Sequence, residues 1–156
     1  MRPIIIAVDG FDGSGKTTLV DRLVRDFVNS GYRCEKERIL TYSMDILTSF
    51  SDGTYDYVDI VPYRVQALMH LTESYCYLNR LMERDAGADI IVFDRWFFSN
   101  VMSVDEWDKE LGLIQHIMSR MLKPNLLIYL NTDSRTIVQR LHDRDDWMVQ
   151  KYTDEQ

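Results

Sequence analysis

Cysteine and proline are scarce in this sequence, which has two cysteines and three prolines among 156 residues. Cys34 and Cys76 lie far apart and outside any Cys-x-x-Cys or Cys/His spacing, so we expect neither a disulfide framework nor a zinc site. Both are expected to be reduced residues of the core. This pattern predicts a cytoplasmic protein, in the host cytoplasm if the protein is viral, and excludes the small disulfide-rich secreted class.

Long apolar runs and an excess of basic residues are also lacking. The apolar run at residues 4–8 is far too short for a membrane span or a signal sequence, and Asp9 closes it. The formal net charge is -7 at pH 7, which disfavours non-specific attraction to nucleic acid. We therefore expect no membrane partner, and DNA binding would need a local basic patch.

The composition predicts a single folded domain over residues 1–156. Apolar residues make up 46% of the chain and charged residues 28%, as is ordinary for a globular protein, and no segment is repeated or low in complexity. A chain of this length can bury a core without the help of disulfides.

Short apolar runs alternate with helical patterns along the chain. Residues 4–8, 90–93 and 126–130 predict buried strands, the last two as inner strands of a parallel sheet, and residues 32–41 predict a more polar strand nearer an edge. Residues 43–62 predict a loop or a short helix. Helices are expected from residue 19 to a stop at Gly31, and over residues 65–84, 106–122 and 134–143, the last capped by Asp133 or Ser134. The alternation predicts a three-layer α/β fold.

A glycine-rich segment follows the first predicted strand and opens the first predicted helix. It satisfies the pattern G-x-x-x-x-G-K-[ST], the P-loop, whose backbone N–H groups and helix N-terminus bind phosphates. Lys16 is expected to bridge the β- and γ-phosphates of ATP, while the Thr17 hydroxyl and the Asp94 carboxylate hold Mg²⁺. The expected nucleotide-binding residues are Gly10, Phe11, Asp12, Gly13, Ser14, Gly15, Lys16, Thr17 and Thr18.

Three motifs in order resemble thymidylate kinases, a family of P-loop kinases. Residues 8–19 resemble the opening signature of the family. Its Asp-Arg-Tyr segment and downstream Ser-Asn are matched by Asp94-Arg95-Trp96 and Ser99-Asn100, and its late strand and lid by Pro124-Asn125-Leu126 and Arg140-x-x-x-Arg144. The resemblance implies a P-loop kinase fold with a mostly parallel sheet, short of or lacking the final strand and helix. It also implies a lid near residues 134–150 and, as one option, a homodimer.

Charged side chains carry the expected phosphoryl transfer. Arg140 and Arg144 stand four residues apart, so a helix would place both on one face, able to close over the phosphates. The alternative is a solvated charged face beside neighbouring aspartates. By resemblance, Arg95 grips the acceptor. The expected catalytic residues are Lys16, Asp94, Arg95, Arg140 and Arg144.

The acceptor side departs from the family pattern. Asp12 would touch the acceptor sugar or the metal shell, or only cap its loop, and Asn100 would read a base edge or serve as an ordinary turn residue. Where the family holds thymine with an aromatic residue and an arginine four residues later, this chain has His70 and Ser74. His70 could be a stacking surface or a general base, but a lone histidine on a helix is more often a packed or exposed side chain. The phosphate-binding segment after the second strand is missing, and Arg38 is the nearest basic residue there.

These departures predict an unusual acceptor. The first interpretation is an ATP- and Mg²⁺-dependent kinase that phosphorylates a thymidine-like pyrimidine deoxynucleotide, namely the hydroxymethyl group of 5-hydroxymethyluridine within phage DNA, as some phage enzymes resembling thymidylate kinase do. One alternative is a free dTMP kinase or a deoxynucleoside kinase. Another is a nucleotide-binding regulator without an acceptor. The aromatic residues 96–98 could stack on a base, but filling the core is the expected use.

Overall fold

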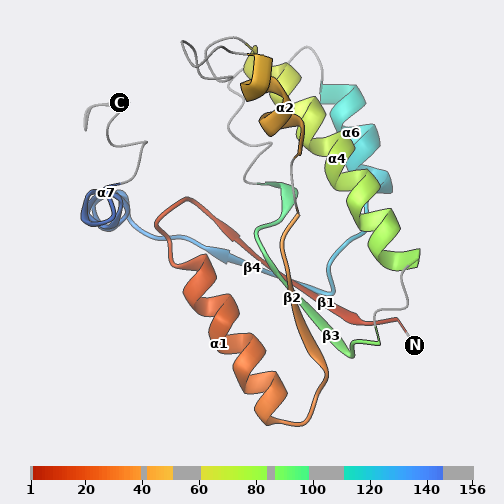
Figure 1. Cartoon of the computed structure of the whole chain (residues 1–156), viewed down its shortest axis with the longest axis vertical. Helices are drawn as coiled ribbons and strands as arrows, with labels where there is room; N and C mark the ends of the chain where they lie inside the picture. Colours follow the sequence, from red (N-terminus) through yellow and green to blue (C-terminus); the bar gives the residue numbers. More distant parts are fainter. Residues whose placement is uncertain (1, 40–41, 51–60, 84–86, 99–110, 146–156) are drawn as a thin grey trace.

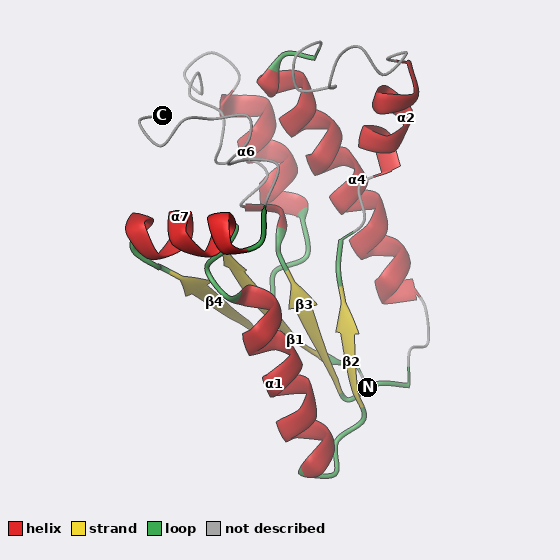
Figure 2. Ribbon diagram, turned by 60° about the vertical axis from the view of Figure 1, so that its left-hand side comes forward, coloured by secondary structure: helices red, strands yellow, loops and turns green. Residues whose placement is uncertain are grey.

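The computed structural model describes residues 2–39, 42–50, 61–83, 87–98 and 111–145. These residues form three layers, with a parallel sheet between two layers of helices (Figure 1). The sheet has four strands in the order β2-β3-β1-β4. Helix α1 covers one face, and α4 and α6 cover the other (Figure 2). The predicted α/β three-layer fold is therefore confirmed.

The strands are β1 (Ile4–Gly10), β2 (Cys34–Glu37), β3 (Ile90–Asp94) and β4 (Leu126–Leu130). In the parallel register Val8 of β1 pairs with Asp94 of β3, and Gly10 pairs with Leu130 of β4. The carboxyl ends of these three strands therefore meet at one edge of the sheet, which is where ligands bind in open α/β sheets.

The helices are α1 (Lys16–Asn29), α2 (Tyr42–Phe50), α4 (Tyr63–Glu83), α6 (Leu111–Arg120) and α7 (Ser134–Asp143). Two predicted helix boundaries are confirmed. Gly31 has a φ of +89° and closes α1 with a hydrogen bond from its N–H to Val28 O, as a left-handed C-terminal stop does. At the start of α7, the Asp133 carboxylate accepts a 2.9 Å hydrogen bond from the N–H of Thr136.

Side chains of β1 alternate between two apolar clusters. Ile5 and Ala7 belong to the cluster under α4 and α6, whereas Ile6 and Val8 belong to the cluster under α1. Both faces of β1 are thus buried, as its unbroken apolar run predicts for an inner parallel strand.

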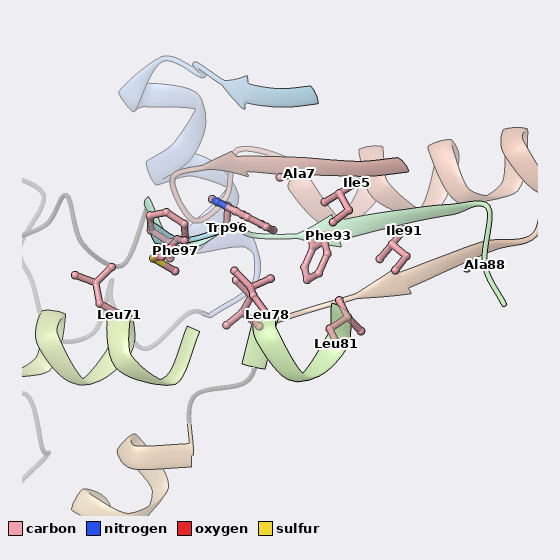
Figure 3. Close-up of a cluster of buried hydrophobic side chains, with 12 residues drawn as sticks. Ile5, Ala7, Leu71, Leu78, Leu81, Ala88, Ile91, Phe93, Trp96 and Phe97 are labelled. Atoms are coloured by element: carbon pink, nitrogen blue, oxygen red, sulfur yellow. The ribbon is translucent and has the colours of Figure 1, made fainter. Parts of the chain in front are cut away.

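The aromatic segment after β3 lies in the cluster under α4 and α6 (Figure 3). Trp96 and Phe97 are 1% and 3% exposed, and the Trp96 ring meets the Phe93 ring edge to face, with centroids 5.0 Å apart. These rings fill the core between helix and sheet, as expected, and anchor the turn that follows Asp94.

Two predictions about position are wrong. The strand at Leu126–Leu130 was expected to be an inner strand, but within the described residues β4 pairs with β1 alone and leaves Tyr129 53% exposed. Both cysteines were expected in the core, and both are free; Cys34 is half-buried and packs against the cluster under α1, whereas Cys76 is exposed on α4. None of the described helices combines the length and apolar character needed to cross a membrane.

Candidate active site

The P-loop connects the end of β1 to the start of α1 and needs glycine at its turns. Gly10 has a φ of +144°, and a Cβ there would lie 2.7 Å from Leu130 O of the neighbouring strand. Gly15, with a φ of +97°, directly precedes the first residue of α1. These backbone conformations aim the first N–H groups of α1 into the loop, where a phosphate would meet the positive end of the helix dipole.

Lys16 lies folded over the loop and is only 5% exposed. Its Nζ donates hydrogen bonds to Gly10 O at 2.8 Å and Phe11 O at 2.6 Å, and lies 3.4 Å from Asp12 Oδ1. Burial, together with the nearby Arg95 guanidinium, lowers the pKa of Lys16, and the Asp12 carboxylate opposes that shift. The ammonium group is thus held at the centre of the cradle by carbonyl oxygens, and it can be shared with a phosphate.

Thr17 and Asp94 place two hard oxygen donors side by side. Thr17 Oγ1 donates a 2.8 Å hydrogen bond to Asp94 Oδ2, and Asp94 is 5% exposed. Within the described residues no group of three or more histidine, cysteine or acidic side chains could enclose a metal ion. One carboxylate and one hydroxyl beside a phosphate cradle fit Mg²⁺, which takes its remaining ligands from phosphates and water.

Arg95 follows β3 and turns over the P-loop. Its φ of +85° is unusual for a residue other than glycine, and its N–H donates to Val8 O at 3.0 Å. The guanidinium Nη2 is hydrogen-bonded to Asp12 Oδ1. This conformation costs free energy, but it directs the Arg95 side chain toward the acidic residue of the loop instead of along the strand.

Helix α7 is attached to the P-loop from the β4 side (Figure 2). Arg140 Nη1 donates a 3.0 Å hydrogen bond to Gly13 O, and Thr132 Oγ1 donates a 3.3 Å bond to Ser14 O. A Cβ at Gly13 would lie 3.3 Å from Ile137 O of the same helix. The absence of a side chain at Gly13 therefore lets α7 approach the loop closely.

One cavity of about 990 Å³ lies over the loop and collects most of the predicted residues. Its lining includes Lys16, Thr17, Asp94 and Arg95, together with Arg140 of α7 and Arg144, the C-cap residue of α7. Arg22 and Arg38 also line the cavity. Neither was predicted as a site residue, although Arg38 was noted as a basic residue near the acceptor. The cavity is thus rich in cations although the chain carries a net charge of -7.

The predicted base-holding residues lie elsewhere. His70 is half-buried and Ser74 is fully buried on α4, and neither lines this cavity. In the described part of the chain, His70 Nδ1 and Ser74 Oγ have no hydrogen-bond partner. Burial lowers the pKa of His70, and the Glu73 carboxylate partly opposes the shift. Asn100 lies outside the described residues.

Known proteins that resemble this chain are kinases. Among curated proteins, a probable thymidylate kinase of Staphylothermus marinus is 28% identical over 141 residues, which cover 86% of this chain and 66% of that protein. Probable thymidylate kinase 1 of Saccharolobus solfataricus is 29% identical over 141 residues, which cover 88% and 69%. The chain thus spans about two thirds of the length of the curated relatives it matches.

Solved structures share the fold. A thymidylate kinase from Ehrlichia chaffeensis aligns with a TM-score of 0.62 at 17% identity, over 97% of this chain and 84% of that one. A deoxyadenosine kinase from M. mycoides, solved with the products dCMP and a flexible dCDP, aligns with a TM-score of 0.56 at 20% identity, over 90% and 71%. Both similarities support a P-loop kinase fold.

The family match covers nearly the whole described chain. The family model for deoxynucleoside kinase matches residues 6–154, from β1 through the P-loop and Asp94 to beyond α7. The expected resemblance to thymidylate kinases is thereby confirmed at the coarser level of P-loop nucleoside and nucleotide kinases. The chain belongs to the deoxynucleoside kinase family.

Proposed function

We propose that this protein transfers the γ-phosphate of ATP to a free pyrimidine deoxynucleoside monophosphate, such as dTMP. The observation that carries the proposal is a cavity over the P-loop, at the carboxyl edge of the sheet, that is lined by six cationic side chains. Arg140 and Arg144 approach it from the β4 edge, and Arg38 from the β2 edge. Three strand spacings separate these edges, about 14 Å, which leaves room for two anionic ligands.

The donor end consists of the P-loop and α7. Lys16 would hold the β- and γ-phosphates, while Arg140 and Arg144 would neutralise the charge that spreads over the transferring phosphoryl group. Thr17 and Asp94 would hold Mg²⁺, which when bound would supply positive charge to the phosphates. The role of the protein in this scheme is positioning and charge stabilisation, which is the main requirement of phosphoryl transfer.

The acceptor end would bind a molecule that carries its own phosphate. Arg95 stands next to the P-loop and Arg38 lines the same cavity, so two guanidinium groups are available to a phosphate dianion. Asp12, paired with Arg95, would accept a hydrogen bond from the acceptor sugar. A nucleoside without a phosphate would leave these cations unused. The relatives named probable thymidylate kinases favour the same class of acceptor.

A second candidate acceptor is the hydroxymethyl group of 5-hydroxymethyluridine within DNA. The replacement of the aromatic and arginine pair by His70 and Ser74 favours an acceptor that differs from dTMP. Asn100 would then read the base edge. The net charge of -7 argues against a DNA strand, which would also have to expose its base to the cavity.

The test supplies ATP labelled at the γ-phosphate together with dTMP, thymidine, 5-hydroxymethyl-dUMP, or DNA containing 5-hydroxymethyluridine. We expect label in the free monophosphates, with no transfer by the Lys16→Ala variant. Label in DNA alone would replace the free acceptor by the DNA acceptor, and label in thymidine alone would indicate a nucleoside kinase. Stabilisation by ATP without any labelled product would indicate a nucleotide-binding regulator instead.

A further inference from the structure

A lysine behind the proposed metal site connects three elements of the fold. Lys36 lies on β2, and its Nζ is 2.6 Å from Asp21 Oδ1 of α1. The same Nζ is 3.8 Å from Asp94 Oδ2 of β3, the oxygen that also accepts the hydrogen bond from Thr17. One ammonium group is therefore shared between a carboxylate outside the cavity and the carboxylate of the metal pair.

The surroundings make this ammonium group relevant to Asp94. The side chain of Asp94 is only 7% exposed, while those of Lys36 and Asp21 are 37% and 52% exposed. Lys36 does not line the cavity. It approaches Asp94 from the side of β2, so a ligand in the cavity would not have to displace it.

We infer that Lys36 is a positioning residue that lowers the affinity of the Thr17–Asp94 pair for a divalent cation, and that Asp21 opposes this effect. The inference rests on the proposed function, because it takes this pair as the metal site. A cation bound to Asp94 is repelled by Lys36, and Asp21 reduces the repulsion by holding the ammonium group away. Lys36 thus weakens metal binding, and Asp21 restores part of it.

The size of the effect follows from electrostatics. A dication and a unit charge about 6 Å apart in a water-like dielectric repel one another enough to change a dissociation constant about tenfold, and salt reduces this to about threefold. Loss of Asp21 would act in the opposite direction, because Lys36 would then keep only Asp94 of its two carboxylate partners in the described part of the chain. Opposite effects from the two members of one ion pair are not expected of a purely structural contact.

The experiment measures Mn²⁺ binding to the full chain without nucleotide, by the electron paramagnetic resonance signal of free Mn²⁺. We expect Lys36→Met to bind Mn²⁺ about threefold to tenfold more tightly than the unmodified protein. Asp21→Asn should bind Mn²⁺ more weakly than the unmodified protein. Lys36→Arg keeps the positive charge and should retain the affinity of the unmodified protein. Arg33→Met, which breaks a 2.8 Å ion pair with Asp89 at the other end of β2, is the matched control and should leave the Mn²⁺ affinity unchanged.

Thr17→Val separates failure of the inference from failure of the site. If Thr17→Val weakens Mn²⁺ binding while Lys36→Met and Asp21→Asn leave it unchanged, the role of Lys36 is overturned and the metal site stands. If Thr17→Val has no effect, Mn²⁺ binds elsewhere, and both the metal site and the role of Lys36 are overturned. Thermal unfolding of each variant verifies that the protein is folded, and equal losses of stability with unchanged Mn²⁺ affinity would identify a structural ion pair.

Discussion

Thr17 Oγ1 donates a 2.8 Å hydrogen bond to Asp94 Oδ2, which joins residues 77 positions apart in the sequence. The register of the sheet makes this contact possible, because Val8 pairs with Asp94 and the chain reaches Thr17 through the P-loop that follows β1. The bond ties the first turn of α1 to the end of β3. Any substitution that shifts the P-loop relative to the sheet should therefore disturb the phosphate cradle and the metal pair together.

Alanine at Gly10 should destabilise the protein and impair nucleotide binding. The added Cβ would lie 2.7 Å from Leu130 O at a φ of +144°, so either the loop or β4 has to shift. We expect a loss of about 2 kcal/mol or more in the free energy of unfolding. Urea unfolding and titration with ATP measure the two effects.

Gly112→Ala is the matched control for this substitution. Gly112 is an exposed residue of α6, and a Cβ there would meet no atom of the described residues within 4 Å. Alanine should stabilise this helix by up to about 1 kcal/mol and leave ATP binding unchanged. Equal responses of the two variants would show that the strained conformation and close approach at Gly10 have no energetic consequence.

Loss of the Arg140 guanidinium should reduce phosphoryl transfer. Arg140 donates to Gly13 O in the loop and lines the same cavity as Lys16. We expect Arg140→Ala to lower kcat about a hundredfold or more, and Arg140→Lys to recover only part of the rate, because an ammonium group cannot reproduce the planar guanidinium fork. Steady-state kinetics with saturating ATP measures the change. Arg135→Ala, on the same helix but outside the cavity lining, should leave kcat unchanged, and a similar loss there would point to general damage to α7.

The Ser74→Ala substitution tests whether the Ser74 hydroxyl contacts the acceptor. The Ser74 side chain is fully buried, and its Oγ has no hydrogen-bond partner in the described part of the chain. A buried hydroxyl without a partner costs about 1–3 kcal/mol, so alanine should raise the free energy of unfolding. If Ser74 contacts the acceptor, the same variant should raise KM for the acceptor and leave KM for ATP unchanged. A stabilised variant with unchanged kinetics would remove Ser74 from the acceptor site.

Local sequence signals predicted three backbone features correctly. The P-loop pattern, the Asp133 cap and the stop at Gly31 depend on residues that are close in sequence, and the structure has all three where they were expected. Asp94 could be placed because a carboxylate at the end of a buried parallel strand must lie at the carboxyl edge of the sheet.

Features that depend on distant neighbours were not predictable in the same way. The apolar composition of β4 resembles that of β3, and nothing in its own residues reveals that it has a single neighbour within the described residues. The contact of Lys36 with Asp21 and Asp94 joins three elements, and no spacing along the chain indicates it. The left-handed φ of Arg95 has no signal in its residue type either, since arginine rarely adopts it.

The ion pair between Arg33 and Asp89 should make stability depend on acid pH. Hydrogen bonds from the Arg33 side chain and backbone N–H lower the pKa of Asp89 from 3.8 to about 2. Because the folded-state pKa lies below the unfolded value, the contribution of this carboxylate is fully present above about pH 4 and is lost as the pH falls toward 2. Thermal unfolding between pH 2.5 and about pH 6 should therefore show a steeper loss of Tm in the unmodified protein than in Asp89→Asn, whose side chain does not titrate.

The two curves should converge at the acid end, and Arg33→Met should reduce the slope in the same way because the carboxylate then titrates near its ordinary pKa. Parallel curves across the whole range would show that Asp89 titrates alike in the folded and unfolded chains, and that the contact with Arg33 does not stabilise its charged form.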